Sequence, residues 1–257
     1  GSLGGGGLTF GRRSTVSLSG KSWGELRIGR DYTPGFWNLS NFHPFGTNGV
    51  GSAGILFYPV QSGARITNVR ASNSVGYFLP GDLGGFYGQA MYAWGNTASS
   101  ATNPDDGRLW GARLGFASGP FDVAVGYSKT KLTPVGDFTQ TNIGGTYDFK
   151  VVKLFVLAGE NKVGATKTKP INVGAHVPFG AGVFRVAIGR VKATGVANDA
   201  TQWTLGYVHN LSKRTALYAN YSQIDNKDAG TTYNVGSPVT APGGESKGWE
   251  LGIRHAF

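Results

Sequence analysis

The sequence predicts an all-β protein: one antiparallel up-and-down β-barrel domain, residues 1–257, that crosses a membrane. Three observations lead to this fold class. Large apolar residues alternate with small or polar residues in many segments, the period-two pattern of strands whose faces meet different surroundings. Short turns alternate with longer loops between these segments, as in a membrane meander. The 43 glycines disfavour helices.

Composition narrows the classes of function. The absence of cysteine excludes disulfides, thiol catalysis and cysteine-based metal sites. No run approaches the roughly 20 apolar residues that a membrane-spanning helix needs, which argues against a helical membrane protein. The 24 Lys and Arg against 14 Asp and Glu give a net charge of +10, which favours anionic partners.

Period-two segments divide the chain into thirteen expected strands. They lie near residues 8–19, 24–30, 70–79, 85–95, 108–117, 120–130, 137–149, 150–161, 168–178, 181–192, 200–211, 214–224 and 247–257. In the segment 120–130, for example, Phe121, Val123 and Val125 alternate with Asp122 and Ala124. A soluble β-sandwich would show similar alternation, so the alternation alone leaves that fold open.

The chemistry of the two faces favours the membrane barrel. Aromatic residues gather on the apolar face near strand ends, as membrane-interface girdles require, at Trp94, Trp110, Tyr127, Tyr147, Trp203, Tyr207, Tyr221 and Trp249. The other face carries Gly, Ser, Thr, Arg and Asn. Such residues suit a water-filled lumen and would make a poor sandwich core.

The strand count raises a question of parity. If the segment 247–257 ends in the periplasm, the thirteenth strand back begins outside, because successive strands alternate in direction. Bacterial single-chain barrels have an even number of strands. We therefore expect the complete barrel to have an odd number of further strands before residue 8, and this chain to be N-terminally incomplete.

Several segments carry a family likeness: GRRSTVSLSG (11–20), GELRIGRDYTP (24–34), RASNSVGYFLP (70–80), YVHNLSKRTALYANYS (207–222) and GWELGIRHAF (248–257). The chain resembles the C-terminal four-fifths of a sixteen-stranded Gram-negative general porin, nearest to the beta-proteobacterial, anion-preferring group. The resemblance implies an outer-membrane homotrimer and passive diffusion of small hydrophilic solutes. It also implies that three strands are missing before residue 11.

The final strand ends on Phe257. In such porins the terminal Phe is read by the barrel-assembly machinery, which the resemblance implies for Phe257. An alternating aromatic strand would also anchor at the lipid interface without any signalling role, and both interpretations stay open.

The segment 31–69 is too long for a bare connection in a compact domain. In porins the corresponding loop folds into the barrel and constricts it. Its apolar residues, among them Trp37, Phe42, Phe45 and Leu56, give a physical reason to agree, since they are costly to leave in water. The alternative is a large surface loop packed on a neighbour.

Charge indicates how this constriction would select solutes. Residues 32–81 contain no Asp or Glu. The family match places Arg12 and Arg70 at the constriction, whereas strict alternation points Arg13, and not Arg12, into the lumen, so we retain all three. A narrow aqueous ring with fixed positive charge attracts anions and repels cations.

Alternation points three further arginines inward, namely Arg113, Arg185 and Arg254. They are expected to be lumen-facing basic residues, although such positions are also occupied by wall residues that are merely solvated.

Other functions find little support in the sequence. The four histidines lie far apart without ligand spacing, and no carboxylate pair suggests acid–base catalysis, so we expect no enzyme activity, metal or cofactor. The basic residues are spread through the strands, which argues against nucleic acid. Expected partners are outer-membrane lipid, identical subunits and small anionic solutes. The alternatives are a substrate-specific anion porin and a plugged barrel acting as an adhesin or structural anchor.

Overall fold

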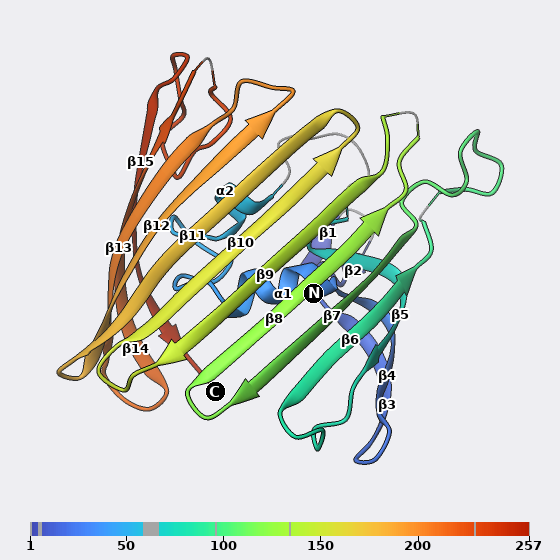
Figure 1. Ribbon diagram of the computed structural model, residues 1–257, viewed down its shortest axis with the longest axis horizontal. Coiled ribbons are helices and arrows are strands. Elements are labelled where there is room, and N and C mark those ends of the chain that lie inside the picture. Colours follow the sequence, from blue (N-terminus) through green and yellow to red (C-terminus); the bar gives the residue numbers. More distant parts are fainter. Residues whose placement is uncertain are drawn as a thin grey trace.

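The computed structural model describes residues 2–4, 7–58, 67–95, 97–133, 135–228 and 230–256. Within these residues, thirteen antiparallel strands form one curved sheet in which each strand pairs with its neighbours in the sequence (Figure 1). The edge strands are β3 and β15, so the sheet is an open wall with a concave and a convex face. The predicted strand number and up-and-down order are confirmed.

The predicted strands match the observed ones closely. In chain order they are β3 (Ser14–Gly20), β4 (Gly24–Tyr32), β5 (Arg70–Phe78), β6 (Phe86–Ala93), β7 (Leu109–Ser118), β8 (Phe121–Thr130), β9 (Phe138–Asp148), β10 (Lys153–Val163), β11 (Thr166–Phe179), β12 (Gly182–Thr194), β13 (Ala200–Asn210), β14 (Thr215–Asn226) and β15 (Glu245–His255).

The first strand differs from its prediction. It was expected over 8–19 but begins at Ser14, after a break at residues 10–13, and β2 (Gly7–Thr9) instead pairs with β1 (Ser2–Gly4) in a separate hairpin. Glycine and adjacent charged residues are weak strand formers, which accounts for the break at Gly11–Arg13. The alternation argument therefore does not apply to Arg12 and Arg13. Phe257 lies outside the described residues.

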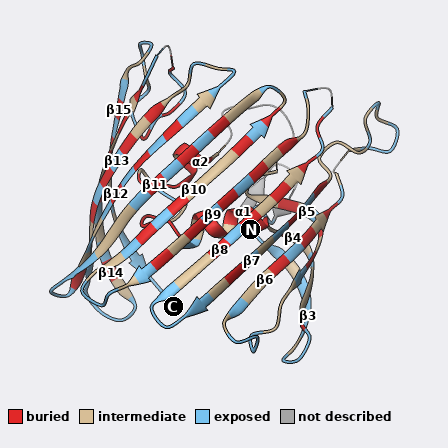
Figure 2. Ribbon diagram, in the orientation of Figure 1, coloured by how far each residue is buried: buried red, intermediate tan, exposed pale blue. Residues whose placement is uncertain are grey.

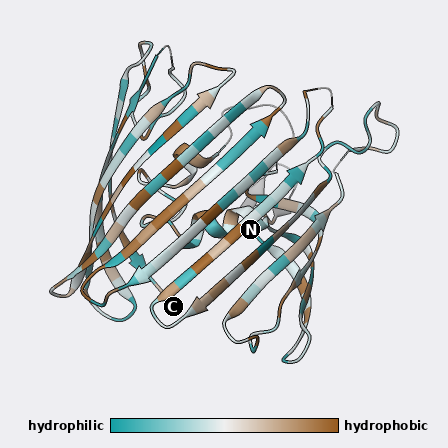
Figure 3. Ribbon diagram, in the orientation of Figure 1, coloured by the Kyte–Doolittle hydropathy of each residue, from teal (hydrophilic) through white to brown (hydrophobic). Residues whose placement is uncertain are grey.

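The distribution of apolar and polar residues over the two faces of the wall is the reverse of that in a soluble protein. On the convex face Leu114, Val125 and Ile143 lie side by side in register and are 52%, 48% and 53% exposed. On the concave face Gln140 and Asn142 are each 2% exposed. Figures 2 and 3 show the same alternation of burial and hydropathy along the strands. Apolar residues outward and polar residues inward are the arrangement of a membrane wall around an aqueous lumen.

Aromatic side chains gather in contacting groups on the convex face. Near the short-turn end, Phe184 contacts both Phe179 and Tyr207. Further along the strands, Tyr221 contacts both Trp203 and Trp249. Amphipathic rings of this kind favour membrane–water interfaces.

The long segment between β4 and β5 carries the two helices, α1 (Pro34–Asn41) and α2 (Gly54–Phe57), which lie on the concave side of the sheet (Figure 1). Neither helix in the described part of the chain is long and apolar enough to cross a membrane. The end of the sheet that carries this segment is the long-loop end; the opposite end holds short turns such as Gly180–Ala181.

Candidate pore constriction

The segment on the concave face begins with a capped helix. Thr33 is the N-cap of α1, and its Oγ1 accepts a hydrogen bond from the Phe36 amide at 3.4 Å. Pro34 occupies the first turn, where its missing N–H costs nothing. The helix packs against β7, β8 and β9. These local signals start a helix directly after the chain turns into the space enclosed by the wall.

A row of wall residues holds this helix by polar contacts. Arg113, Gly126 and Asn142 are in register on neighbouring strands of the concave face. Asn38 of α1 lies over Gly126: its amide donates to Asn142 Oδ1 at 2.8 Å, and its Oδ1 accepts from Arg113 Nε. Asn142 in turn donates to the Gly35 carbonyl at 3.0 Å. A Cβ on Gly126 would lie 2.9 Å from Asn142 Oδ1, so the glycine keeps room for this network.

An apolar cluster also holds the segment against the wall. Phe42 and Leu39 are fully buried and pack with Leu56, Phe57 and the wall in one hydrophobic cluster. A Cβ on Gly144 of β9 would lie 2.5 Å from the Phe42 ring. The missing side chain at position 144 therefore forms the notch that receives Phe42.

The rest of the segment is tied to the wall strand by strand. Asn161 of β10 donates to the Phe57 carbonyl at 2.9 Å, and His176 Nε2 of β11 donates to the Pro44 carbonyl at 2.7 Å. At the other side of the wall, Glu250 of β15 accepts from the Val50 amide at 3.3 Å. Residues 33–58 thus span the concave face from β7 to β15.

One buried histidine in this segment is neutral. His43 is 6% exposed, and burial lowers its pKa from 6.5 to about 3, with a smaller contribution from the charge on His176. Its Nδ1 accepts from the Phe45 amide at 3.2 Å, which requires an unprotonated nitrogen. Protonation of His43 and seating of the segment are therefore opposed.

Two of the predicted lumenal arginines contact the segment directly. Arg113 binds Asn38 and lies with its Cζ 4.7 Å from the centre of the Tyr87 ring. Arg185 lies 4.8 Å from the Phe45 ring centre and donates to Asn220 Oδ1 at 2.9 Å. Both guanidinium groups thus stand on the concave face where the segment approaches the wall.

Arg254 joins Arg185 at a small cavity. The cavity has a volume of about 210 Å³, and its lining comprises Phe45, Asn48, Arg185, Val208, Tyr218, Asn220, Glu250 and Arg254. Glu250 is engaged there by Val50, by Asn220 at 3.2 Å and by Tyr218 at 3.4 Å. Two guanidinium groups therefore share the cavity with a single carboxylate whose oxygens are already hydrogen-bonded.

Arg12 and Arg70, which the family resemblance places at the constriction, lie close together near β4. Arg70 at the start of β5 donates to the Tyr32 hydroxyl at 3.4 Å and lies 4.8 Å from the ring centre. Arg12 is exposed and interacts with the same hydroxyl. Arg13 is also exposed and lies within electrostatic reach of Glu25. The three arginines thus border the side of the concave face opposite Arg185.

The sequence did not reveal that Asp31, the acidic residue at the start of the segment, pairs with Arg27. Asp31 is 2% exposed and bonded by Arg27 at 2.7 Å, and Arg27 also binds Glu25 at 2.9 Å. Alternation with Leu26 and Ile28 would have placed Arg27 on the concave face. Asn38, Asn142 and Glu250 were also missed, because nothing in a single sequence distinguishes polar residues that bind a loop from those that face water.

The described residues contain no cluster of His, Asp or Glu that could hold a metal ion. What they contain is a polar-lined wall, apolar on its other face, with a segment bound across its hollow and arginines on either side. This is the architecture of a barrel that conducts solutes through its interior.

Comparison with known proteins agrees. Residues 1–229 match the family described as Gram-negative porin, so the chain belongs to the Gram-negative porin family. It is 37% identical to outer membrane porin protein 32 of Delftia acidovorans, covering 98% of this chain and 75% of that protein. It is 27% identical to an outer membrane porin protein of Bordetella pertussis, covering 98% of this chain and 73% of that protein.

A solved structure matches as well. The anion-selective porin from Comamonas acidovorans is 34% identical and superimposes with a TM-score of 0.82, covering 98% of this chain and 80% of that one. The predictions of a porin, of a diffusion channel and of an outer-membrane location are confirmed. The relatives are porins, which are channels rather than enzymes.

Proposed function

We propose that this porin lets small hydrophilic solutes diffuse passively and prefers anions, through a constriction made by the segment 31–69 and the wall arginines. The observation that carries the proposal is the imbalance of charge where segment and wall meet. The segment brings no acid after Asp31, and Asp31 is buried in an ion pair with Arg27, which also binds Glu25. Arg70, Arg113 and Arg185 lie on the wall around it.

The partial burial of these arginines supports the same conclusion. Charges in a narrow site with low-dielectric walls are screened less than charges in bulk water, so their field acts further along the pore. Arg12, Arg13 and Arg254 extend the positive field on both sides. The Comamonas relative, described as anion-selective, is consistent with this assignment. We also propose a homotrimer, which the family resemblance implies.

Planar-bilayer recordings under a salt gradient test the proposal. We expect stepwise, ohmic channels with a reversal potential of anion sign. The double variant Arg12→Glu/Arg70→Glu should move this potential toward zero or beyond it. The matched control, Lys213→Glu/Arg214→Glu, reverses two charges in the short turn before β14 and should leave it near the wild-type value. An unchanged potential in the first variant would contradict the assigned role of Arg12 and Arg70.

The cavity beside Arg185 favours a second candidate, a channel specific for one small anion. Two guanidinium groups with Tyr218 and Asn48 could bind a carboxylate or phosphate. Saturation of the current by one such anion, abolished by Arg254→Gln, would support the specific channel. Silence in the bilayer would favour the structural anchor.

A further inference from the structure

The segment across the wall contains a pair of residues whose chemistry the pore function does not use. Asn48 is followed by Gly49, and this is the only Asn–Gly pair in the sequence. The side-chain amide carbon of an asparagine can be attacked by the backbone nitrogen of the next residue, and glycine hinders this attack least because it has no side chain. Asn48 is therefore the asparagine of this chain whose neighbour most favours loss of the amide.

The structure leaves this pair open to the reaction. Asn48 and Gly49 are both exposed. Among the described residues, neither the Asn48 side chain nor the Gly49 N–H has a hydrogen-bond partner. A backbone nitrogen whose hydrogen is not held by an acceptor can lose its proton to hydroxide and act as a nucleophile. The aqueous side of the wall also supplies the water that the reaction consumes.

The fold itself requires glycine at position 49. Gly49 has a φ of +77°, in the left-handed region that favours glycine. A Cβ at this position would lie 2.1 Å from Glu250 Oε2, and Glu250 accepts a hydrogen bond from the neighbouring Val50 amide. A larger residue, which would protect Asn48, is thus excluded by the contact that fastens the segment to β15.

The other two asparagines of residues 33–58 are protected. Asn38 is fully buried, and both its amide nitrogen and its amide oxygen are hydrogen-bonded. Asn41 is exposed, but it is followed by Phe42, whose side chain hinders the approach of the backbone nitrogen. The Phe42 N–H is also held, since it donates to the Asn38 carbonyl at 2.9 Å. Within this segment, the conditions for loss of the amide meet at Asn48 alone.

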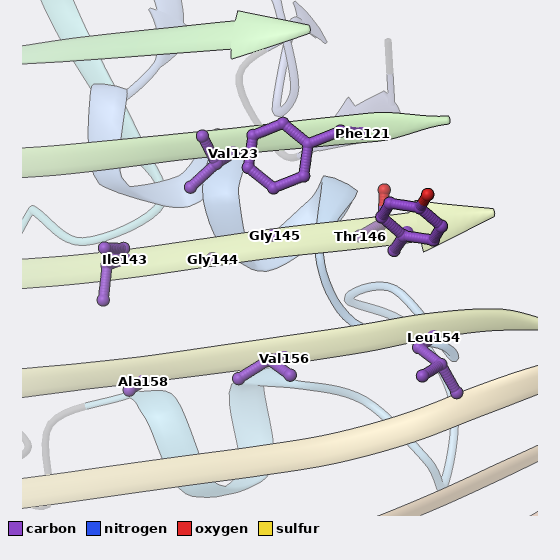
Figure 4. A pocket seen from close by; sticks show the side chains of 10 residues that line it. Phe121, Val123, Ile143, Gly144, Gly145, Thr146, Leu154, Val156 and Ala158 are labelled. Carbon is purple, nitrogen blue, oxygen red and sulfur yellow. The ribbon is translucent and has the colours of Figure 1, made fainter. Parts of the chain in front are cut away.

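Asn48 also lies where a new charge would act on the pore, because it lines the cavity shared by Arg185, Arg254 and Glu250. A hollow on the convex face offers a contrast: the groove beside Phe121 has a volume of about 410 Å³ and no charged residue in its lining (Figure 4). In the cavity beside Asn48, two guanidinium groups face one carboxylate. A second carboxylate, at position 48, would cancel this surplus of positive charge.

We propose that Asn48 deamidates spontaneously and that this modification lowers the anion preference of the pore as the protein ages. The Gly49 nitrogen bonds to Asn48 Cγ, its proton passes through water to Nδ2, and the Cγ–Nδ2 bond breaks, so that ammonia leaves and a succinimide ring remains. Water then opens the ring at either carbonyl carbon, which gives aspartate or, with the backbone passing through Cγ, isoaspartate. The sum is the uptake of water and the release of ammonia, without oxidation or reduction. The effect on ion selection rests on the proposed function, whereas the deamidation does not.

Peptide mass spectrometry tests the modification on the folded protein, incubated in detergent for days at mildly alkaline pH and compared with freshly purified protein. The peptide with Asn48 should gain the mass of an amide-to-acid conversion and become a substrate of isoaspartyl methyltransferase, whereas the peptide with Asn41 should keep its mass. The variant Asn48→Gln should not react, because glutamine would have to close a larger ring. A wild-type amide at position 48 as long-lived as that of Asn41 would overturn the proposal, as would its loss only after denaturation.

Planar-bilayer recordings under a salt gradient test the effect on ion selection. The reversal potential of the wild type should move toward zero during the incubation, and fresh Asn48→Asp should show the lower value from the start. The potential of Asn48→Gln should stay constant with time. The matched control, Asn210→Asp, adds a carboxylate at the short-turn end of β13 and should remain near the fresh wild type.

The outcomes separate this proposal from the proposed function. If Asn48 deamidates but aged wild type and Asn48→Asp keep the potential of fresh wild type, the effect on ion selection is overturned. A fresh wild type without anion preference would instead refute the proposed function, and the mass of the Asn48 peptide would still decide the deamidation.

Discussion

Replacing Phe42 with alanine should release the segment that narrows the pore. Phe42 is fully buried between the segment and the wall, with its ring in the notch above Gly144. Removing a buried phenylalanine costs about 3 to 5 kcal/mol, because apolar burial is lost and a cavity remains. The strands retain their own hydrogen bonds, so this loss falls on the seating of residues 33–58.

A loss of this size shifts the equilibrium between the seated and the released segment roughly 10²- to 10⁴-fold toward release. Arg113 would lose a ring neighbour and its fixed contact with Asn38. We therefore expect Phe42→Ala channels to be larger and noisier and to discriminate less between anions and cations. Chymotrypsin should cut the segment at its aromatic residues faster than in the wild type.

Two further variants sharpen this test. Phe121→Ala removes a phenylalanine from the convex face of β8 and should leave conductance and cleavage unchanged. Gly144→Ala places a methyl group against Phe42 and should disturb the segment by itself, whereas combining it with Phe42→Ala should cost less than the sum, since the clash is gone. Wild-type conductance, noise and cleavage in Phe42→Ala would refute the seating argument.

Three other perturbations act on the same region. Burial lowers the pKa of His43 to about 3 in the seated segment, so its contribution to seating is complete above pH 6.5 and is lost as the pH falls toward 3. The loss reaches about 3 kcal/mol at about pH 4. Conductance noise should therefore rise as the pH falls over this range, and His43→Asn should flatten this pH dependence. Glu250→Gln removes a lumenal negative charge but keeps an acceptor for Val50, so the reversal potential should shift further toward anions; a shift toward cations would contradict this. Arg27→Met leaves Asp31 buried and unpaired, which should cost about 3 to 5 kcal/mol and lower the thermal unfolding temperature; adding Asp31→Asn should restore most of it.

The wall was predictable from the sequence because its two faces meet very different solvents. Lipid outside and water inside force a strict period of two, and most strand ends were placed within a few residues. The exception lies at residues 8–19. There Gly11 interrupts the pattern, and Val16 and Leu18 alone carried the expected alternation back to the arginines before Ser14.

The inner contacts were much less predictable. Asn38 and Asn142 are 104 residues apart, and their pairing depends on the register that brings Gly126 between Arg113 and Asn142. Alternation states which face a residue occupies but not which residues of that face meet. The notch at Gly144 was equally hidden, because a glycine on the polar face of a glycine-rich strand has no signature until a ring is found in it.

The net charge alone does not predict ion selectivity, because a charged residue acts on the pore only if it lies on the inner face of the wall. A charge of +10 favours anionic partners, yet five of the 24 lysines and arginines lie on the convex face of β10–β12, namely Lys162, Lys167, Lys169, Arg190 and Lys192. Those five act on the membrane side of the wall and contribute little to a field inside the pore, since the segment and wall lie between. We therefore attribute the proposed anion preference to Arg70, Arg113 and Arg185 beside a segment that has no acidic residue after Asp31. Neutralising those five residues should leave ion selectivity unchanged, whereas neutralising the inner arginines should reduce it.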